Sequence, residues 1–358
     1  MPDFPYPERN NSCDTLIFDD RFQQLWQMVG DTPMIKLCYR YNSRTSFILV
    51  KCEQYNLTGS IKDRIALYIL QQAYRNGEIF PGYTIIEATS GNTGISFAAI
   101  GKALGHPVKI IMPDWLSSEQ REIIKSMGAE VILVTKVDGG FSGSIQLAEF
   151  MRTKEKCFLP RQFENSLNAE AHERTTAPEI WNQLLQYKMR PDAFIAGVGT
   201  GGTVMGVAKY FQRQNKNIQV FPIEPAESPI LSSGCKKYNH RIQGISDEFI
   251  PPIVRLEQLG RVIQAHDGDA ILMAQKLARQ LGLAVGISSG ANIIGAIKIK
   301  EELGQDACVV SLFPDCSKKY LSTDLFRNES ERTEYITPNI DFIGYQPLEK
   351  CFSKIVHR

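Results

Sequence analysis

The sequence predicts an α/β fold with two domains, each a mainly parallel, twisted sheet flanked by helices. The first observation is that short apolar runs rich in β-branched residues alternate with longer stretches of helical periodicity. Such alternation is typical of βαβ units and therefore of parallel sheets. The second observation is length, since 358 residues exceed one typical hydrophobic core and suffice for two.

The predicted elements follow one another in a regular order. Strands are expected at residues 47–50, 84–88, 108–112, 131–134, 193–198, 220–224, 284–286 and 308–312. Helices are expected at residues 61–77, 95–104, 118–127, 142–154, 178–186, 204–212, 267–281 and 292–303. Because parallel sheets bind ligands beyond the carboxyl ends of their strands, chemistry is expected in the turns from strand to helix.

The chain divides at a polar, loop-like stretch near residue 160. We expect a smaller, mobile N-terminal domain at 53–160 and a larger domain made of 20–52 plus 161–328. Residues 329–358 show weak periodicity and are expected to form a C-terminal arm, extended or in contact with a partner.

Composition excludes several classes of function. A formal net charge of +1 gives no dense basic surface for nucleic acid or an anionic membrane. The sequence contains no apolar run long enough to span a bilayer, and residues 1–11 do not resemble a signal peptide. Eight scattered cysteines without a CxxC pair indicate neither disulfides nor a metal site. We therefore expect a cytoplasmic protein without a metal.

The first strand-to-helix turn is TGSIKDR at residues 58–64. Ser60 followed by Asp63 predicts a capping box with Ser60 as the N-cap, which places Lys62 in the first helical turn. The helix macrodipole disfavours an ammonium there, and a free amine is the form that makes a Schiff base. By its position alone, Lys62 fits a solvated surface residue better than a reactive one.

The second turn is EATSGNTG at residues 87–94, between an apolar strand and an apolar helix. Its hydroxyls, glycines and helix N-terminal amides suit an anion such as a carboxylate. Asn92 adds a neutral donor that could reach a ring hydroxyl. A glycine-rich turn without a ligand is the alternative.

The third turn is GVGTGGT at residues 197–203, and it supports two interpretations. Its backbone amides and two threonine hydroxyls suit a phosphate at a helix N-terminus. Gly197, Gly199 and Gly202 also fit GxGxxG, with Glu224 at the end of the following strand, which is the dinucleotide fingerprint.

The fourth turn is GISSGAN at residues 286–292, where a serine hydroxyl could bond a heteroaromatic nitrogen. An ordinary serine N-cap is the alternative. Taken together and in this order, the four turns resemble those of the cysteine synthase and cystathionine β-synthase family of fold-type II pyridoxal-phosphate enzymes. The pattern is most similar to that of O-acetylserine sulfhydrylases. The resemblance runs from VGDTPM at 29–34 to YLS at 320–322.

The resemblance implies a role for each matching position. Lys62 would carry pyridoxal 5′-phosphate as an internal aldimine and move the Cα proton. Asn92 would bond the 3′-oxygen of the cofactor, and Ser288 would face its pyridine nitrogen. The 5′-phosphate would be held by Gly199, Thr200, Gly201, Gly202 and Thr203. The substrate carboxylate would be bound by Thr89, Ser90, Asn92, Thr93 and Gln162.

The implied reaction is β-replacement on a serine-type amino acid through an aminoacrylate intermediate. We expect this chain to be a cysteine synthase, which makes cysteine and acetate from O-acetylserine and sulfide. Alternatives are cysteine- or serine-using replacements that release hydrogen sulfide, form lanthionine or cystathionine, or use an amine. An NAD-dependent oxidoreductase is the remote alternative. The resemblance also implies a homodimer, and it leaves open a partnership with a serine acetyltransferase.

The main departure from the family pattern is GISDEFIP at residues 244–251. Two carboxylates, Asp247 and Glu248, stand where O-acetylserine sulfhydrylases have Gly-Ala-Gly before Phe-Ile-Pro. They could repel a sulfide anion, protonate a poor leaving group or activate a neutral nucleophile. They could equally point into solvent.

Overall fold

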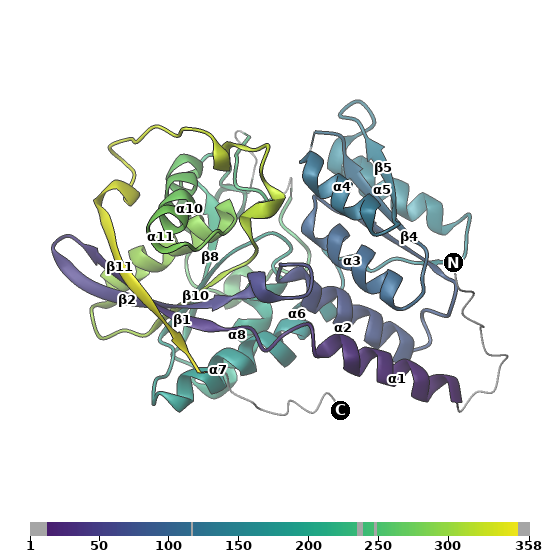
Figure 1. The fold of residues 1–358 in the computed structure, drawn as a ribbon, viewed down its shortest axis with the longest axis horizontal. Helices are drawn as coiled ribbons and strands as arrows, with labels where there is room; N and C mark the ends of the chain where they lie inside the picture. Colours follow the sequence, from purple (N-terminus) through teal and green to yellow (C-terminus); the bar gives the residue numbers. More distant parts are fainter. Residues whose placement is uncertain (1–12, 116, 235–238, 247–248, 350–358) are drawn as a thin grey trace.

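A computed structural model describes residues 13–115, 117–234, 239–246 and 249–349. It contains one seven-stranded sheet and one four-stranded sheet. Figure 1 shows the seven-stranded sheet with α7, α8, α10 and α11 on one side of the molecule, and β4 and β5 with α3, α4 and α5 on the other. The two-domain α/β class predicted from the sequence matches this arrangement.

The seven-stranded sheet has the order β11-β1-β2-β10-β7-β8-β9. Its strands are β1 (Met34–Tyr41), β2 (Arg44–Cys52), β7 (Ala193–Gly197), β8 (Gln219–Pro225), β9 (Ile263–Ala265), β10 (Val309–Phe313) and β11 (Ile340–Leu348). From β2 to β9 all neighbours are parallel, whereas β1 pairs antiparallel with both β2 and β11. The C-terminal segment expected as an arm therefore contains an edge strand of this sheet.

Helices cover both faces of the seven-stranded sheet. One face packs on α10 (Asp267–Leu281) and α11 (Ile287–Leu303), and the other on α7 (Ala177–Gln186) and α8 (Gly202–Gln214). Both faces are apolar because buried side chains alternate along each strand. In β7, Phe194 faces the α8 side and Ile195 faces the α11 side.

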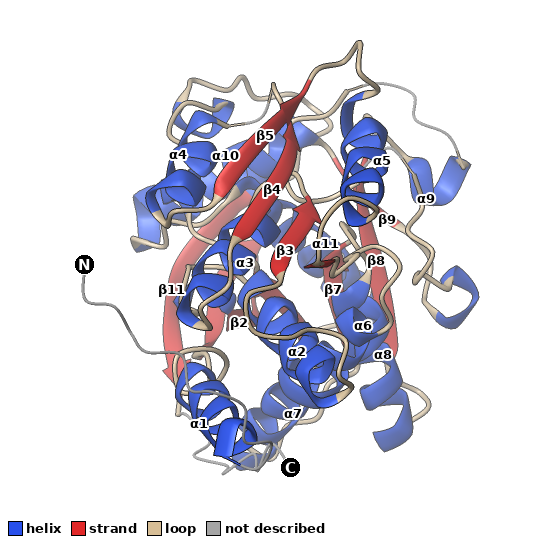
Figure 2. Cartoon of the chain, turned by 90° about the vertical axis from the view of Figure 1, so that its right-hand side faces the viewer, coloured by secondary structure: helices blue, strands red, loops and turns tan. Residues whose placement is uncertain are grey.

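The four-stranded sheet is fully parallel in the order β5-β4-β3-β6. Its strands are β3 (Thr84–Ala88), β4 (Val108–Pro113), β5 (Glu130–Val134) and β6 (Cys157–Phe158). On one face lie α2 (Lys62–Arg75), α3 (Asn92–Ala103) and α4 (Ser118–Ser126), and α5 (Gly140–Arg152) covers the other. Figure 2 shows this sheet edge-on between α3 and α5.

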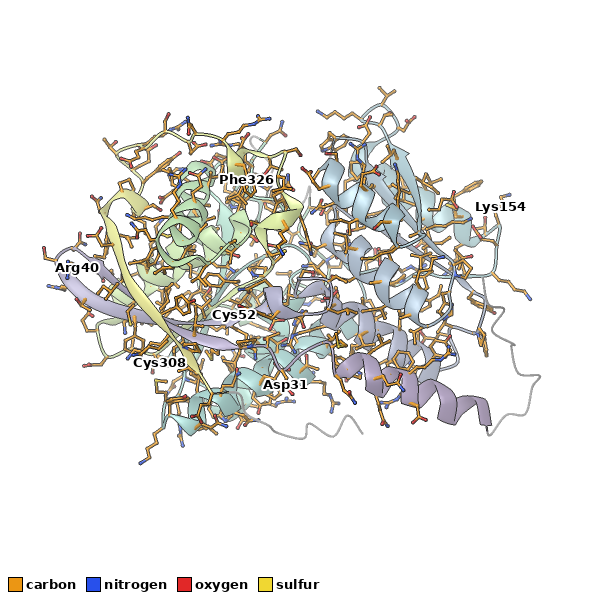
Figure 3. The ribbon with its side chains drawn as sticks, in the orientation of Figure 1. Asp31, Arg40, Cys52, Lys154, Cys308 and Phe326 are labelled. Carbon is orange, nitrogen blue, oxygen red and sulfur yellow. The ribbon has the colours of Figure 1, made fainter. Side chains whose placement is uncertain are left out.

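The remaining helices and helical turns complete the chain. They are α1 (Cys13–Trp26), α6 (Leu167–Ala171), a π-helix at His172–Thr176, α9 (Ile230–Ser233) and the 3-10 turns Glu53–Tyr55, Leu256–Gln258, Ser317–Lys319, Asp324–Phe326 and Thr337–Asn339. In Figure 3, Arg40 of β1 and Lys154, just after α5, mark opposite ends of the molecule. Within the described ranges no helix is both long and apolar enough to cross a bilayer. The cysteines described there, Cys38, Cys52, Cys157, Cys308 and Cys316, are all free thiols.

Two local predictions were wrong. The predicted strand 284–286 is only an isolated bridge between Val285 and Cys316, because the chain turns directly into α11. The predicted capping box does not form. Ile61 is the N-cap of α2, and the Asp63 carboxylate accepts bonds from the N–H and hydroxyl of Thr58, 2.7 and 2.6 Å away. The Asp63 side chain therefore bonds the turn that precedes α2, and not the N–H group of the predicted N-cap.

A buried ion network joins the two halves of the fold at Arg64. Its guanidinium contacts the carboxylates of Glu53, at 2.6 Å, and Glu179, at 2.7 Å, and all three side chains are buried. Lys51 adds a second cation 2.8 Å from Glu179, and Thr32 donates its hydroxyl to Glu53. Burial lowers and the two carboxylates raise the pKa of Arg64, leaving it well above its usual value. Two cations thus face two anions, and the network links β2, the 3-10 turn at 53–55, α2 and α7.

We expect Arg64→Met to lower the free energy of unfolding by about 3–5 kcal/mol, because it leaves two buried carboxylates without their shared partner. Urea unfolding followed by circular dichroism measures it. Arg75→Met, at the exposed end of the same helix, is the matched control and should change stability by about 0.5 kcal/mol or less. Similar losses in the two variants would contradict this role of Arg64.

Candidate functional site

One pocket lies between the two sheets, where several strand-to-helix turns meet. Nearly all the residues singled out from the sequence line it: Lys62, Thr89, Ser90, Asn92, Thr93, Gln162, Gly199, Thr200, Gly201, Thr203 and Ser288. Gly202 is the exception, since it is buried behind the pocket wall at the start of α8. Asp247 and Glu248 lie outside the described residues, although residues 243–245, which precede them, line the pocket.

Lys62 is the first residue of α2, as its placement in the first helical turn predicted. Its N–H donates to the Ser60 hydroxyl at 3.3 Å, and Ile61 packs beside it in the pocket wall. The backbone before it is fixed by the bond from the Ile61 N–H to the carbonyl of Pro314 at 2.8 Å. The backbone from which the Lys62 side chain extends is therefore held in place at a contact between the two halves of the molecule.

The turn at 89–93 presents hydroxyls and amides at the start of α3. The Thr89 hydroxyl accepts the N–H of Gly91 at 3.0 Å, and the Thr93 hydroxyl donates to the Gln162 amide oxygen at 2.6 Å. Gly91 has φ of 150°, and a Cβ there would lie 2.3 Å from the Gln120 side chain. Only glycine fits, which keeps the first amides of α3 open to a ligand.

The turn at 199–203 forms a cradle of backbone amides at the start of α8. A Cβ would lie 2.4 Å from the Gly244 carbonyl at Gly199 and 2.2 Å from Val254 at Gly201, where φ is +85°. The close packing therefore requires glycine. Asn168 donates to the Thr200 hydroxyl at 2.9 Å and to the Gln162 carbonyl at 2.7 Å, so one amide links this cradle to Gln162, whose side chain accepts the Thr93 hydroxyl.

His172 supports the cradle and was not anticipated from the sequence. It is buried in the π-helix, with Nε2 3.3 Å from the Thr203 hydroxyl and Nδ1 2.9 Å from the Thr176 hydroxyl. Burial and the nearby charges of Arg64 and Lys62 hold the pKa of His172 well below its usual value. A neutral imidazole can therefore bond Thr203 without adding charge to the site.

Electrostatics favours an anionic ligand. Among the described lining residues Lys62 is the only charged side chain, and the rest present amides, hydroxyls and apolar groups. Backbone amides and two threonine hydroxyls at the start of a 13-residue helix fit a phosphate group, and Lys62 lines the same pocket. Pyridoxal phosphate, which carries a phosphate and an aldehyde, therefore suits these residues. No group of His, Cys, Asp and Glu within the described ranges could hold a metal ion.

Glu224 argues against a dinucleotide. Its buried carboxylate accepts the N–H groups of Leu231 and Ser232, at 2.7 and 3.2 Å, and the Ser232 hydroxyl at 2.5 Å. It therefore caps α9 and is not among the residues that line the pocket. The GxGxxG turn lacks the acidic residue that would bind a ribose.

Several pocket residues were missed by sequence reasoning. They are Gln120, Phe163, Ala196, Gln243, Leu312, Pro314 and Tyr320. Tyr320 lies in the stretch that ends the family resemblance, which was the one available signal. The others reach the pocket through tertiary packing that no local pattern reports.

Glu87 is a buried acid behind the turn at 89–93, which was expected to bind a carboxylate. It lies on β3, and its two oxygens accept the N–H groups of Ala88 at 2.9 Å and Gln162 at 3.3 Å. Burial raises the pKa of Glu87 to about 8, although both N–H groups oppose the rise. At neutral pH it is therefore mostly protonated, and it holds the backbone of Gln162 while Gln162 holds Thr93.

Comparison with known proteins identifies close relatives over most of the chain. The family described as pyridoxal-phosphate dependent enzyme matches residues 25–315. A cysteine synthase of Staphylococcus aureus is 41% identical over 300 residues, which are 84% of this chain and 96% of that protein. A probable cysteine synthase of Bacillus subtilis is 38% identical over the same shares.

Solved structures extend this similarity. A hydrogen sulfide-producing enzyme of Fusobacterium nucleatum is 48% identical with a TM-score of 0.89, covering 92% of this chain and 100% of that one. A mutant of it, solved with an α-aminoacrylate intermediate, is 50% identical with a TM-score of 0.88, covering 90% and 97%. A cysteine synthase of Entamoeba histolytica is 34% identical with a TM-score of 0.78, covering 93% and 96%.

We expect Glu87→Gln to be more stable than the wild type at high pH. The pKa of Glu87 is about 8 when folded against 4.5 for an ordinary glutamate, so the wild type loses stability as the pH rises through this interval. Glutamine mimics the protonated acid and avoids the loss.

The difference in unfolding free energy between Glu87→Gln and wild type should grow by on the order of 4 kcal/mol from pH 4.5 to pH 9. Denaturant unfolding at several pH values measures it, with Glu78→Gln at an exposed position as control. A difference that stays flat with pH would show that Glu87 ionises normally.

Proposed function

Since this chain belongs to the family of pyridoxal-phosphate dependent enzymes, we propose that it catalyses β-replacement on a serine-type amino acid with a sulfur leaving group. Cysteine is the substrate that fits: its C–S bond breaks, the sulfur leaves as hydrogen sulfide, and a nucleophile bonds to Cβ. With water as nucleophile the products are serine and hydrogen sulfide. The observation that carries this choice is the 48% identity over nearly the whole chain to a hydrogen sulfide-producing enzyme.

The pocket residues supply the remaining functions. Pyridoxal phosphate, when bound, supplies the chemistry that stabilises negative charge at Cα. Lys62 holds the cofactor and moves the Cα proton, because it is the only charged group among the described lining residues. Asn92 bonds the 3′-oxygen of the cofactor, and Ser288 faces its ring nitrogen without a charge.

Anion binding divides between two turns. The phosphate rests on residues 199–203 at the start of α8, with Thr203 held by His172. The substrate carboxylate rests on Thr89, Ser90, Asn92 and Thr93, with Gln162 fixed by its bond to Thr93. Both anions are thus bound by helix N-termini and hydroxyls, which require no further cation.

A cysteine synthase reaction is the second candidate. The curated relatives at 41% and 38% identity carry that name, and the pocket architecture supports the same first half-reaction with acetate as leaving group. The two candidates differ only in what leaves Cβ and what replaces it.

We propose a cytoplasmic homodimer, with residues 53–160 closing over the carboxylate as a mobile unit against 20–52 plus 161–328. Docking of a serine acetyltransferase is an open alternative for the partner. Light scattering of the purified protein tests the dimer.

We expect Lys62→Ala to abolish the visible band near ~410 nm that a Schiff base produces, and borohydride to remove it from the wild type. The wild type should release hydrogen sulfide from cysteine faster than it releases acetate from O-acetylserine. Both are measured by incubating the holoenzyme with each amino acid in turn. A wild type without the band would refute the cofactor assignment, and faster acetate release would favour the second candidate.

We expect Asp247→Asn with Glu248→Gln to slow hydrogen sulfide release from cysteine by at least about tenfold, because a thiolate leaving group and a water nucleophile both need proton transfer. Turnover of O-acetylserine with sulfide should change far less, since acetate leaves without a proton. Equal effects on both reactions would exclude a selective role for these carboxylates.

A further inference from the structure

A buried charged cluster borders the pocket, and none of the roles above uses it. It follows β10 and comprises Asp315, Lys319 and Tyr320, whose exposed fractions are only 1, 3 and 2%. Tyr320 lines the pocket, and Asp315 is close enough to Lys62 to feel its charge. Buried charges are costly, so their place beside the pocket calls for a function.

The cluster encloses the side-chain amide of Asn92. The amide nitrogen donates to the Asp315 carboxylate at 2.6 Å and to the Tyr320 hydroxyl at 3.2 Å. On the other side, Lys319 donates to the amide oxygen of Asn92 at 2.7 Å. Tyr320 donates its own hydroxyl to the same oxygen of Asp315, which fixes the carboxylate. The amide therefore lies between an anion at its nitrogen and a cation at its oxygen.

This arrangement fixes which way the amide points. A half-turn of the Asn92 amide would set its oxygen against the Asp315 carboxylate and its NH₂ group against the Lys319 ammonium. Each contact would replace a charge-assisted hydrogen bond by repulsion in a region removed from water. Asn92 thus has one favoured orientation before any ligand binds.

We propose that Asp315 and Lys319 are positioning residues that hold the Asn92 amide in a single orientation, in which the N–H that donates to the Tyr320 hydroxyl, the longer of its two bonds, would be given to the 3′-oxygen of the cofactor. The inference rests on the proposed role of Asn92. Lys319 also keeps a buried cation in contact with Asn92, which lines the pocket. The cluster thereby sets the electrostatic surroundings of the cofactor without touching the reacting atoms.

The first test removes the cation. Lys319→Met should weaken pyridoxal-phosphate binding by roughly tenfold, the worth of about one charge-assisted hydrogen bond, and should shift intensity from the visible band to the near ultraviolet. Lys319→Arg should keep most of the wild-type spectrum and affinity, because it retains the charge. Lys318→Met is the matched control, since Lys318 is the exposed neighbour on the same turn.

The second test separates positioning from stability. The double variant Asn92→Asp with Asp315→Asn keeps one carboxylate and one amide in contact and leaves Lys319 an anionic partner. The double variant should regain most of the decrease in thermal unfolding midpoint that either single substitution causes. Its visible spectrum and cofactor affinity should stay altered, because a carboxylate now faces the cofactor oxygen.

Two results would overturn the proposal. One is a Lys319→Met holoenzyme with the spectrum and affinity of Lys318→Met, and the other is a double variant that regains the wild-type spectrum together with its stability. Failure of the proposed function looks different, because the wild type itself would then lack a borohydride-sensitive visible band.

Discussion

The buried pairing of Arg64 with Glu53 and Glu179 is the contact on which the site depends. Arg64 lies two residues after Lys62, so the helix that begins at the pocket is anchored on its opposite side to α7 and to the 3-10 turn after β2. Desolvating these ions is costly, and it is offset because every charge in the group has a partner at close range. Lys51 completes the balance at Glu179. A shift of α2 would break the network and move Lys62 at the same time.

The rest of the pocket follows from parallel topology. Helices α3, α8 and α11 all begin at the carboxyl ends of parallel strands or directly beside them, and their first residues line the same pocket. Each helix start leaves free N–H groups that need an acceptor. The glycines at 91, 199 and 201 allow the backbone to approach where a Cβ would collide with neighbouring atoms. Anion binding is thus a property of the fold's architecture more than of any one side chain.

Sequence reasoning succeeded where a signal was local. Buried strands such as β3 and β4 read as apolar runs, and the strand-to-helix turns carried glycines and hydroxyls at the right places. It failed where the information lay in distant pairing. Strand β11 pairs with β1, which lies some three hundred residues earlier in the sequence, and no pattern within β11 indicates this partner. The capping box failed because Thr58 offers the Asp63 carboxylate two donors at once, which a spacing rule does not see.

The cluster around Asn92 also could not be predicted from local sequence patterns. Asp315 at the end of β10 has the position expected of a functional residue, yet its importance depends on Lys319, Tyr320 and an amide more than two hundred residues earlier. Only the folded chain shows that these four groups form one unit.

The buried titratable groups around this site add little charge to it. Glu87, whose pKa is about 8, is mostly protonated at neutral pH, His172 is neutral, and Asp315 lies with Lys319 around the Asn92 amide. In the proposed site, the cofactor phosphate and the substrate carboxylate would therefore meet dipoles, which bind either anion regardless of what the substrate carries at Cβ. Discrimination between leaving groups must then come from a part of the site with its own charge. We propose that Asp247 and Glu248, which follow the pocket-lining residues 243–245 in the sequence, supply it.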